Sequence, residues 1–334
     1  MATTTVRRMS PPSAAAGTAS TATSTTTSTA RTQPLLGLAS VIGTTADRPT
    51  LFRCNPATHT LAYAAGSVVV LHDLAHDKQL AFLHHDHHGS GGNAVSALAF
   101  SDDGAYLAVA ESGLNPCVLV WDTLSCSLLA EIPGHRYGIS CVAFSPRHRD
   151  VIVSVGVPHD GSLFVHNWRS AGGKKIASNK ITSKVHAIAF LPGDGLTFVT
   201  AGHRHLKYWS LHGIEEPVRG RAAQQQLVEG RSAVLGEYRD ATFVDLLADD
   251  SHPEDMRMFA FTSEGVLCSL GGSRTIERWV GLKVPLWFLS WAHVFFFLIH
   301  TGTHVVRNDH CRVVHCLWLQ RWRREVTERN RKEL

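Results

Sequence analysis

The sequence predicts an all-β fold made of a unit that repeats about every 45 residues. After residue 34, short runs of β-branched and aromatic residues alternate with Gly, Pro, Asp and Asn, as in strands joined by turns. Three segments can be aligned on a central phenylalanine: Phe100 in 95–113, Phe144 in 139–156 and Phe190 in 185–202. These phenylalanines are 44 and 46 residues apart, and a weaker copy at 51–66 lies upstream of them.

Each copy contains two strands joined by a turn of Ser, Asp, Pro and Gly, and a third strand follows. The third strands share one register position, which is occupied by His72, Trp121, His166 and Trp209. A period of about 45 residues with about four strands is typical of a β-propeller blade. We therefore predict a β-propeller over residues 35–284, with about five readable blades.

The fifth of these units is irregular. Its four candidate strands are 241–247, 256–262, 265–270 and 275–284. An acidic insertion, 248–255, separates the first two strands, and the spacing places Cys268 at the register position of Trp121. An incomplete ring leaves a sheet face and an edge unpaired, so we expect the isolated chain to aggregate or to require a partner.

The repeated motifs carry a family resemblance. Gly134-His135, the FSDDG turn at 100–104 and Trp121-Asp122 resemble the WD-repeat family, whose propellers usually have seven blades and bind proteins. Longer stretches are similar to the first propeller of the mitogen-activated protein kinase-binding protein 1 family: 134–146, 177–190, 230–238 and 276–284. That family comprises large scaffolds and includes a spindle-pole relative. The resemblance covers roughly residues 35–284 and implies that the chain is a truncated part of a seven-blade ring.

The resemblance also implies a set of structural positions in the repeat. These are Phe100, Trp121, Asp122, His135, Phe144, Ser154, Asp160, Phe190 and Trp209. His135, Asp160 and Ser154 match the imidazole, the turn acid and the strand hydroxyl of the family's internal hydrogen-bond network. We expect the indole N–H of Trp121 to bond a hydroxyl or an imidazole of its own blade. His72 and His166 stand where a regular repeat has Trp, so the blades are degenerate.

Charge and composition divide the chain into three parts. Residues 1–34 are rich in Thr, Ser and Ala, carry three Arg and no acid, and are predicted to be a disordered arm. Residues 35–284 hold 21 basic and 24 acidic side chains, so the predicted propeller has no basic excess and we expect no nucleic-acid partner. Residues 285–334, with eight basic and four acidic side chains, form an aberrant tail, first apolar and then basic.

The cysteines and the C-terminal tail predict the cellular location of the protein. The seven Cys form no CxxC pair, and no secretory signal opens the chain, which indicates a reducing, cytoplasmic compartment. The resemblance adds the centrosome or spindle pole and the cytoskeleton. Residues 286–306 are long enough to cross a membrane, so the alternative is a membrane-tethered propeller protein.

The sequence indicates a non-catalytic scaffold for protein–protein interactions. We expect no catalytic residue, cofactor, bound metal or small-molecule substrate, and we interpret the HHDHH run at 84–88 as a solvated loop. The resemblance implies partners from kinase pathways or the spindle pole. Candidate partner-facing residues, chosen from their loop positions, are Arg136, Tyr137, Arg147, His148, Arg149 and Arg204, together with the acidic 248–255 loop.

Overall fold

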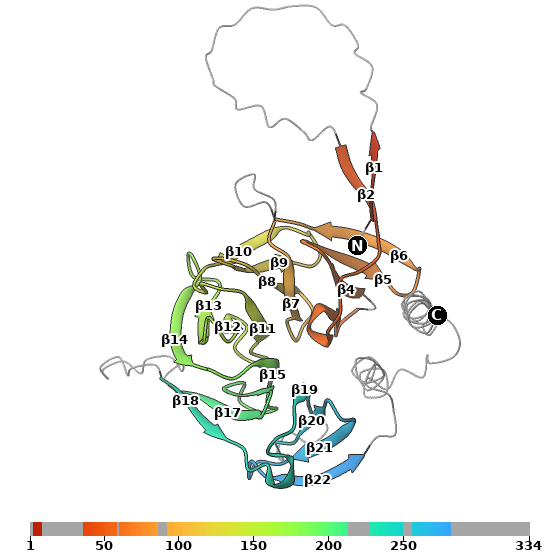
Figure 1. Ribbon diagram of the computed structural model, residues 1–334. Helices are drawn as coiled ribbons and strands as arrows, with labels where there is room; N and C mark the ends of the chain where they lie inside the picture. Colours follow the sequence, from red (N-terminus) through yellow and green to blue (C-terminus); the bar gives the residue numbers. More distant parts are fainter. Residues whose placement is uncertain are drawn as a thin grey trace, which may run out of the picture.

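A computed structural model shows five four-stranded antiparallel sheets arranged around a common axis (Figure 1). The structure describes residues 3–8, 36–58, 60–85, 92–212, 227–249 and 256–281. Helical structure in these ranges is limited to two short 3-10 turns, η1 (Pro49–Leu51) and η2 (Gly236–Tyr238). The prediction of an all-β propeller with five blades is therefore confirmed.

The strands of each blade follow chain order from the axis outward. Blade 1 contains β3 (Phe52–Cys54), β4 (Thr60–Ala65), β5 (Val68–Asp73) and β6 (Lys78–Leu83). Blade 2 contains β7 (Val95–Phe100), β8 (Tyr106–Glu111), β9 (Val118–Asp122) and β10 (Leu128–Ile132). Blade 3 contains β11 (Ile139–Phe144), β12 (Val151–Gly156), β13 (Ser162–Asn167) and β14 (Lys174–Lys180). Blade 4 contains β15 (Val185–Phe190), β16 (Thr197–Gly202), β17 (His205–His212) and β18 (Leu227–Ser232), and blade 5 contains β19 (Phe243–Ala248), β20 (Met258–Thr262), β21 (Val266–Leu270) and β22 (Ile276–Gly281).

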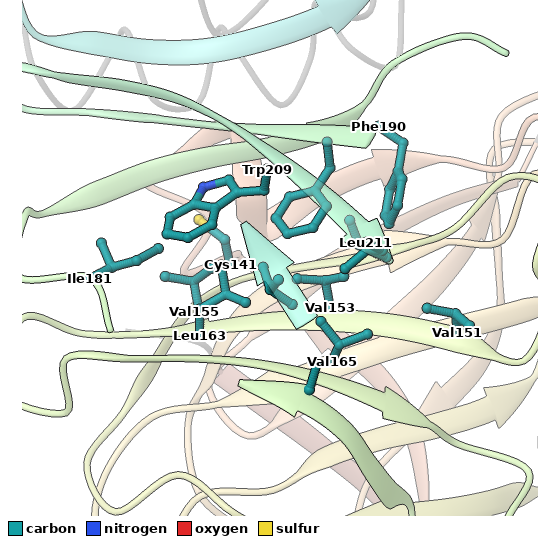
Figure 2. Close-up of a cluster of buried hydrophobic side chains, with 14 of the residues drawn as sticks. Cys141, Val151, Val153, Val155, Leu163, Val165, Ile181, Phe190, Trp209 and Leu211 are labelled. Atoms are coloured by element: carbon teal, nitrogen blue, oxygen red, sulfur yellow. The ribbon is translucent and has the colours of Figure 1, made fainter. Parts of the chain in front are cut away.

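The blades are held together by apolar contacts between neighbouring sheets. Between blades 2 and 3, the small side chains of Ala97 and Ala110 pack in one cluster with Ile139 and Phe144 of β11. Between blades 3 and 4, Val153 and Val165 pack near Trp209, which is fully buried (Figure 2). Because every residue of β12 is buried, this strand is covered on both of its faces, which explains why its residues are apolar or small.

A hydrogen bond between successive blades recurs at the ends of the inner strands. Asn55, after β3, donates its side-chain N–H to the carbonyl oxygen of Gly104 in the next blade, at 2.9 Å. Ser145, after β11, donates to the carbonyl oxygen of Gly195 at 2.7 Å. Both glycines have positive φ angles, and a Cβ on Gly104 would lie 2.0 Å from Asn55 Oδ1. Glycine therefore provides both the turn conformation and the close approach.

The N-terminal part of the chain covers one face of blade 1. β2 (Leu36–Ile42) pairs with β1 (Thr3–Arg8), so the structure differs at 3–8 from the predicted disordered arm, whose residues 9–35 lie outside the described residues. The run of Thr and Val in β1 favours a strand. Val41 of β2 is buried beside Tyr63 and exchanges two hydrogen bonds with the side chain of Gln79.

Blade 5 has the four strands that the sequence predicts but not the predicted register. Leu270 pairs with Met258 as Trp209 pairs with Phe198, so Leu270 occupies the register position that the spacing assigns to Cys268. The error arises because the insertion before β20 removes the regular spacing on which the alignment depends. Of the insertion itself, residues 250–255 lie outside the described residues.

The predicted C-terminal tail, 285–334, and the membrane segment proposed at 286–306 also lie outside the described residues. In the ranges that the structure describes, no helix has the length and apolar character that a membrane span requires. The membrane-tethered alternative is therefore not tested by this structure.

Removing the indole of Trp121 should destabilise the protein. Trp121 is buried in the cluster between blades 1 and 2, so Trp121→Ala should lower the free energy of unfolding by about 3–5 kcal/mol. The matched control is Leu124→Ala, because Leu124 follows β9 and is 94% exposed. Urea denaturation of both variants checks the prediction, and equal midpoints would show that the register of β9 is wrong.

Gly104→Ala should cost more stability than Gly172→Ala. Both glycines have similar positive φ angles, but a Cβ on Gly172 has no atom within 4 Å. Each substitution should cost about 1–2 kcal/mol for the left-handed backbone. Gly104→Ala should add about 1–3 kcal/mol because the methyl group displaces Asn55 from its buried bond. Thermal denaturation measures the difference, and equal losses would mean that the bond between blades 1 and 2 does not contribute.

Candidate interaction surface

The loops of the propeller lie on two opposite faces. We define the top face by the connections between successive blades and by the turn between the second and third strands of each blade. The bottom face carries the remaining two turns of each blade. This division follows from the antiparallel order of the strands, because alternate connections fall at opposite ends of a sheet.

On the top face of blade 3, the structure brings together His135, Asp160 and Ser154. His135 Nδ1 lies 2.8 Å from Asp160 Oδ2, and His135 Nε2 lies 2.8 Å from Ser154 Oγ. Because the carboxylate can only accept, Nδ1–H donates to Asp160, and Nε2 of the neutral imidazole accepts from the Ser154 hydroxyl. Burial lowers the pKa of His135 and outweighs the opposing effect of Asp160, which keeps the ring neutral.

Asp160 joins this buried chain to the surface loop. Its Oδ1 accepts hydrogen bonds from the backbone N–H groups of Arg136 at 2.7 Å and Tyr137 at 3.2 Å. Burial alone would raise the pKa of Asp160, but the bonds from His135, Arg136 and Tyr137 together lower it, so the carboxylate is ionised. One buried carboxylate therefore fixes the backbone of two exposed residues.

The geometry of a serine, a histidine and an aspartate is also that of a nucleophilic triad. Ser154 is only 1% exposed and lies inside the sheet on β12, so no substrate carbon can reach its Oγ. The arrangement can hold a loop in place, but it cannot attack a substrate.

The six residues predicted to face partners lie on different faces. Arg136, Tyr137 and Arg204 lie on the top face, in the β10–β11 connection and the β16–β17 turn. Arg147, His148 and Arg149 lie on the bottom face, in the β11–β12 turn. They therefore do not form one site, and strand counting could have shown this from the sequence.

Two of the four arginines in these loops form ion pairs with described residues. Arg204 pairs with Asp240 at 2.9 Å on the top face, and Arg149 pairs with Asp103 at 3.1 Å on the bottom face. Arg136 makes no ion pair with any described residue, and its guanidinium lies 5.9 Å from the centre of the Tyr137 ring. Arg136 is thus an exposed cation whose charge is not compensated within the described ranges.

An aromatic cluster on the bottom face was not predicted. Trp168 is buried next to Tyr106, with ring centres 5.0 Å apart, and its Nε1–H donates to the carbonyl oxygen of Arg149. The guanidinium of Arg169 lies 4.6 Å from the Trp168 ring. The sequence feature that could have indicated this cluster is Trp168 itself, a tryptophan directly after a predicted strand and outside the aligned positions. Its contacts are structural, since they close the interface between blades 2 and 3.

The next feature concerns metal binding in the described ranges. No group of three His, Cys, Asp or Glu side chains there has the geometry of a metal site. In the HHDHH run, His85 Nε2 lies 3.6 Å from Glu131 Oε2, whereas residues 86–88 lie outside the description. The predicted solvated loop is therefore not tested over most of its length.

Comparisons with known proteins agree with this geometry. The family model described as "WD domain, G-beta repeat" matches residues 78–122 and 126–167. The first match runs from β6 to β9 and the second from β10 to β13. The fold is a WD40-repeat β-propeller. The chain is 39% identical over 249 residues to mouse mitogen-activated protein kinase-binding protein 1, and 36% identical over 255 residues to pig WD repeat-containing protein 62. These matches cover 75% and 76% of this chain but only 16% of each relative.

A solved structure supports the same WD40 fold. A chain in the crystal structure of the mitotic checkpoint complex superposes with a TM-score of 0.52 at 16% sequence identity. The match covers 70% of this chain and 65% of that chain. At this identity the similarity supports the fold alone.

The WD40 blades share the network of blade 3 only in part. In blade 4, Trp209 Nε1–H donates to Thr200 Oγ1 at 2.8 Å, and His205 Nε2 lies 2.8 Å from the same oxygen. In blade 2, Val109 occupies the position of Ser154 and Thr200, so Trp121 has no hydroxyl to bond. Within the described residues the predicted bond of its indole N–H is not formed.

The other predicted repeat positions lie on the expected strands. Phe100, Phe144 and Phe190 end the inner strands of blades 2, 3 and 4. Asp122 ends β9, and its carboxylate accepts from the backbone N–H groups of Leu124 and Ser125 at 3.0 Å and 2.7 Å. This aspartate therefore fixes the turn between the last two strands of blade 2.

His166 should make stability depend on pH. Burial, with smaller contributions from His135 and Lys175, lowers the pKa of His166 to about 4, from 6.5 in an unfolded chain. Between these values the unfolded state takes up a proton that the folded state does not. Stability should therefore fall as pH drops from about 6.5 to about 4, by on the order of 3 kcal/mol for this residue.

Urea denaturation of His166→Phe at a series of pH values tests this assignment. The variant should lose part of the wild-type pH dependence, whereas His159→Phe, at an exposed position, should keep it. Burial lowers the pKa of His205 to about 4 and also lowers the pKa of His135, so both should contribute to the dependence that remains. An unchanged slope in His166→Phe would contradict the assignment.

Proposed function

We propose that this chain is a non-catalytic WD40 scaffold that binds other proteins through loops on the faces of its propeller. The supporting observation is the buried Asp160, whose carboxylate holds the backbone of Arg136 and Tyr137 while both side chains remain exposed. Rigid presentation of Arg and Tyr side chains favours protein binding, because these residue types dominate the binding energy of interfaces and little order is lost on association.

The partners and the location are part of this proposal. Similarity to a protein named for mitogen-activated protein kinase binding supports a partner from a kinase pathway. The family resemblance of the sequence, which includes a spindle-pole relative, supports a cytoplasmic, cytoskeletal location. Because the chain spans 16% of these relatives, we assign it only the interactions of a propeller. We further propose that the five blades belong to a seven-blade ring.

Affinity capture with the full chain tests the scaffold proposal. Folded chain should enrich a reproducible set of cell proteins at least tenfold over the same chain unfolded by heat, which is about 1.4 kcal/mol of binding free energy. A variant with His84, His85, His87 and His88 changed to Ser should capture the same set, which excludes retention through bound metal. If the folded chain enriches no protein relative to the unfolded chain, the scaffold proposal is wrong. A set without kinases or spindle-pole proteins would overturn only the proposed partner class.

A further inference from the structure

We infer that the top face between blades 2 and 3 binds a protein segment that places an apolar side chain next to a carboxylate. The site consists of Leu114, Arg136 and Tyr137, and we call it the Leu114–Tyr137 patch. The inference rests on the proposed scaffold function and adds what that proposal leaves open, namely where a partner binds and what chemistry it presents.

Backbone hydrogen bonds hold the patch in one conformation. Leu114 and Tyr137 form an antiparallel bridge between the β8–β9 turn and the β10–β11 connection. The N–H of Asn115 donates to the carbonyl oxygen of Arg136 at 3.0 Å, and Asp160 accepts from the backbone N–H groups of Arg136 and Tyr137. Two loops from neighbouring blades are therefore fixed to each other and to the buried histidine.

The side chains of the patch are exposed although their backbone is fixed. Leu114 is 72% exposed and Tyr137 is 38% exposed. Asn115 has a φ of 48°, a left-handed conformation that Asn tolerates better than most residues and that holds the turn in which Leu114 lies. Because this leucine contributes little to the core, its removal should leave stability unchanged. An apolar side chain and an aromatic ring fixed at the surface provide an anchor for an apolar group of a partner.

The charge of Arg136 determines the second feature of the partner, its carboxylate. At the equivalent junction between blades 4 and 5, His203 forms a bridge with Thr242, and the arginine is already paired, because Arg204 contacts Asp240. At the Leu114–Tyr137 patch, Arg136 has no such acid among the described residues. A guanidinium over a tyrosine ring retains N–H donors that can bind a carboxylate with two bonds. Charge complementarity therefore favours an acidic segment over a basic or neutral one.

Random peptides displayed on phage and selected on the full chain provide the probe. The selected peptides should share an apolar residue next to Asp or Glu. Fluorescence polarisation of one selected peptide should show that Arg136→Glu and Leu114→Ala each weaken binding about tenfold or more. Added salt should also weaken binding, because one of the two contacts is between charges.

Matched controls come from the bottom face. Arg147→Glu changes an exposed arginine without a described ion pair, and Leu124→Ala changes an exposed leucine. Both variants should leave the affinity for the peptide unchanged. Wild-type melting temperatures for all four variants would show that lost binding is not lost folding. Selected peptides that lack an acidic residue would overturn the proposed binding site. Equal peptide affinity of wild type and Arg136→Glu would also overturn it. If captured cell proteins also bind the variant that combines Arg136→Glu with Leu114→Ala as they bind wild type, the patch is wrong and the scaffold stands. If wild type captures no protein, the scaffold itself is wrong.

Discussion

The propeller depends on covering the apolar faces of its sheets. Four apolar clusters lie between the five successive blades, and each contains residues from two neighbouring sheets. The same requirement applies to the first blade, whose other face carries Leu61, Tyr63 and Val70. Val41 of β2 packs on these residues, and its backbone bonds the side chain of Gln79 instead of a neighbouring strand of the blade. The position of β2 thus follows from apolar burial.

Apolar packing also explains why the polar network can degenerate from blade to blade. Trp121 remains buried beside Leu107 although Val109 offers no hydroxyl, because most of its stabilisation comes from the area that the indole buries. In blade 3 the histidine, acid and hydroxyl are all present, but His166 replaces the tryptophan, and its Nδ1 has no partner among the described residues. Blade 3 keeps the bonds by which His135 and Asp160 hold the backbone of the β10–β11 connection. In blade 4 the buried part of the network, Trp209 with Thr200 and His205, is retained instead.

Periodicity in the sequence predicted the elements that recur and missed those that do not. The strands and the register of Trp121 and Trp209 follow from the spacing, because each blade repeats the same pairing. Leu270 was missed because the insertion before β20 breaks the period. Trp168 was missed because it lies in a turn outside the aligned positions. The pairing of β1 with β2 joins residues that are far apart and carry no repeat, so only the fold could show it.

The candidate site shows the same limit in a different way. The sequence identified Arg136 and Tyr137 as loop residues, and strand order alone would have separated them from Arg147 and Arg149. Which arginines keep an uncompensated charge could not be predicted, because Arg149 and Arg204 find their acids across blade boundaries, whereas Arg136 and Arg147 pair with no described acid. Those pairs exist only when the sheets are packed around the axis. The sequence therefore determines which groups reach the surface, whereas the packing of the blades determines which of them still has a charge to offer a partner.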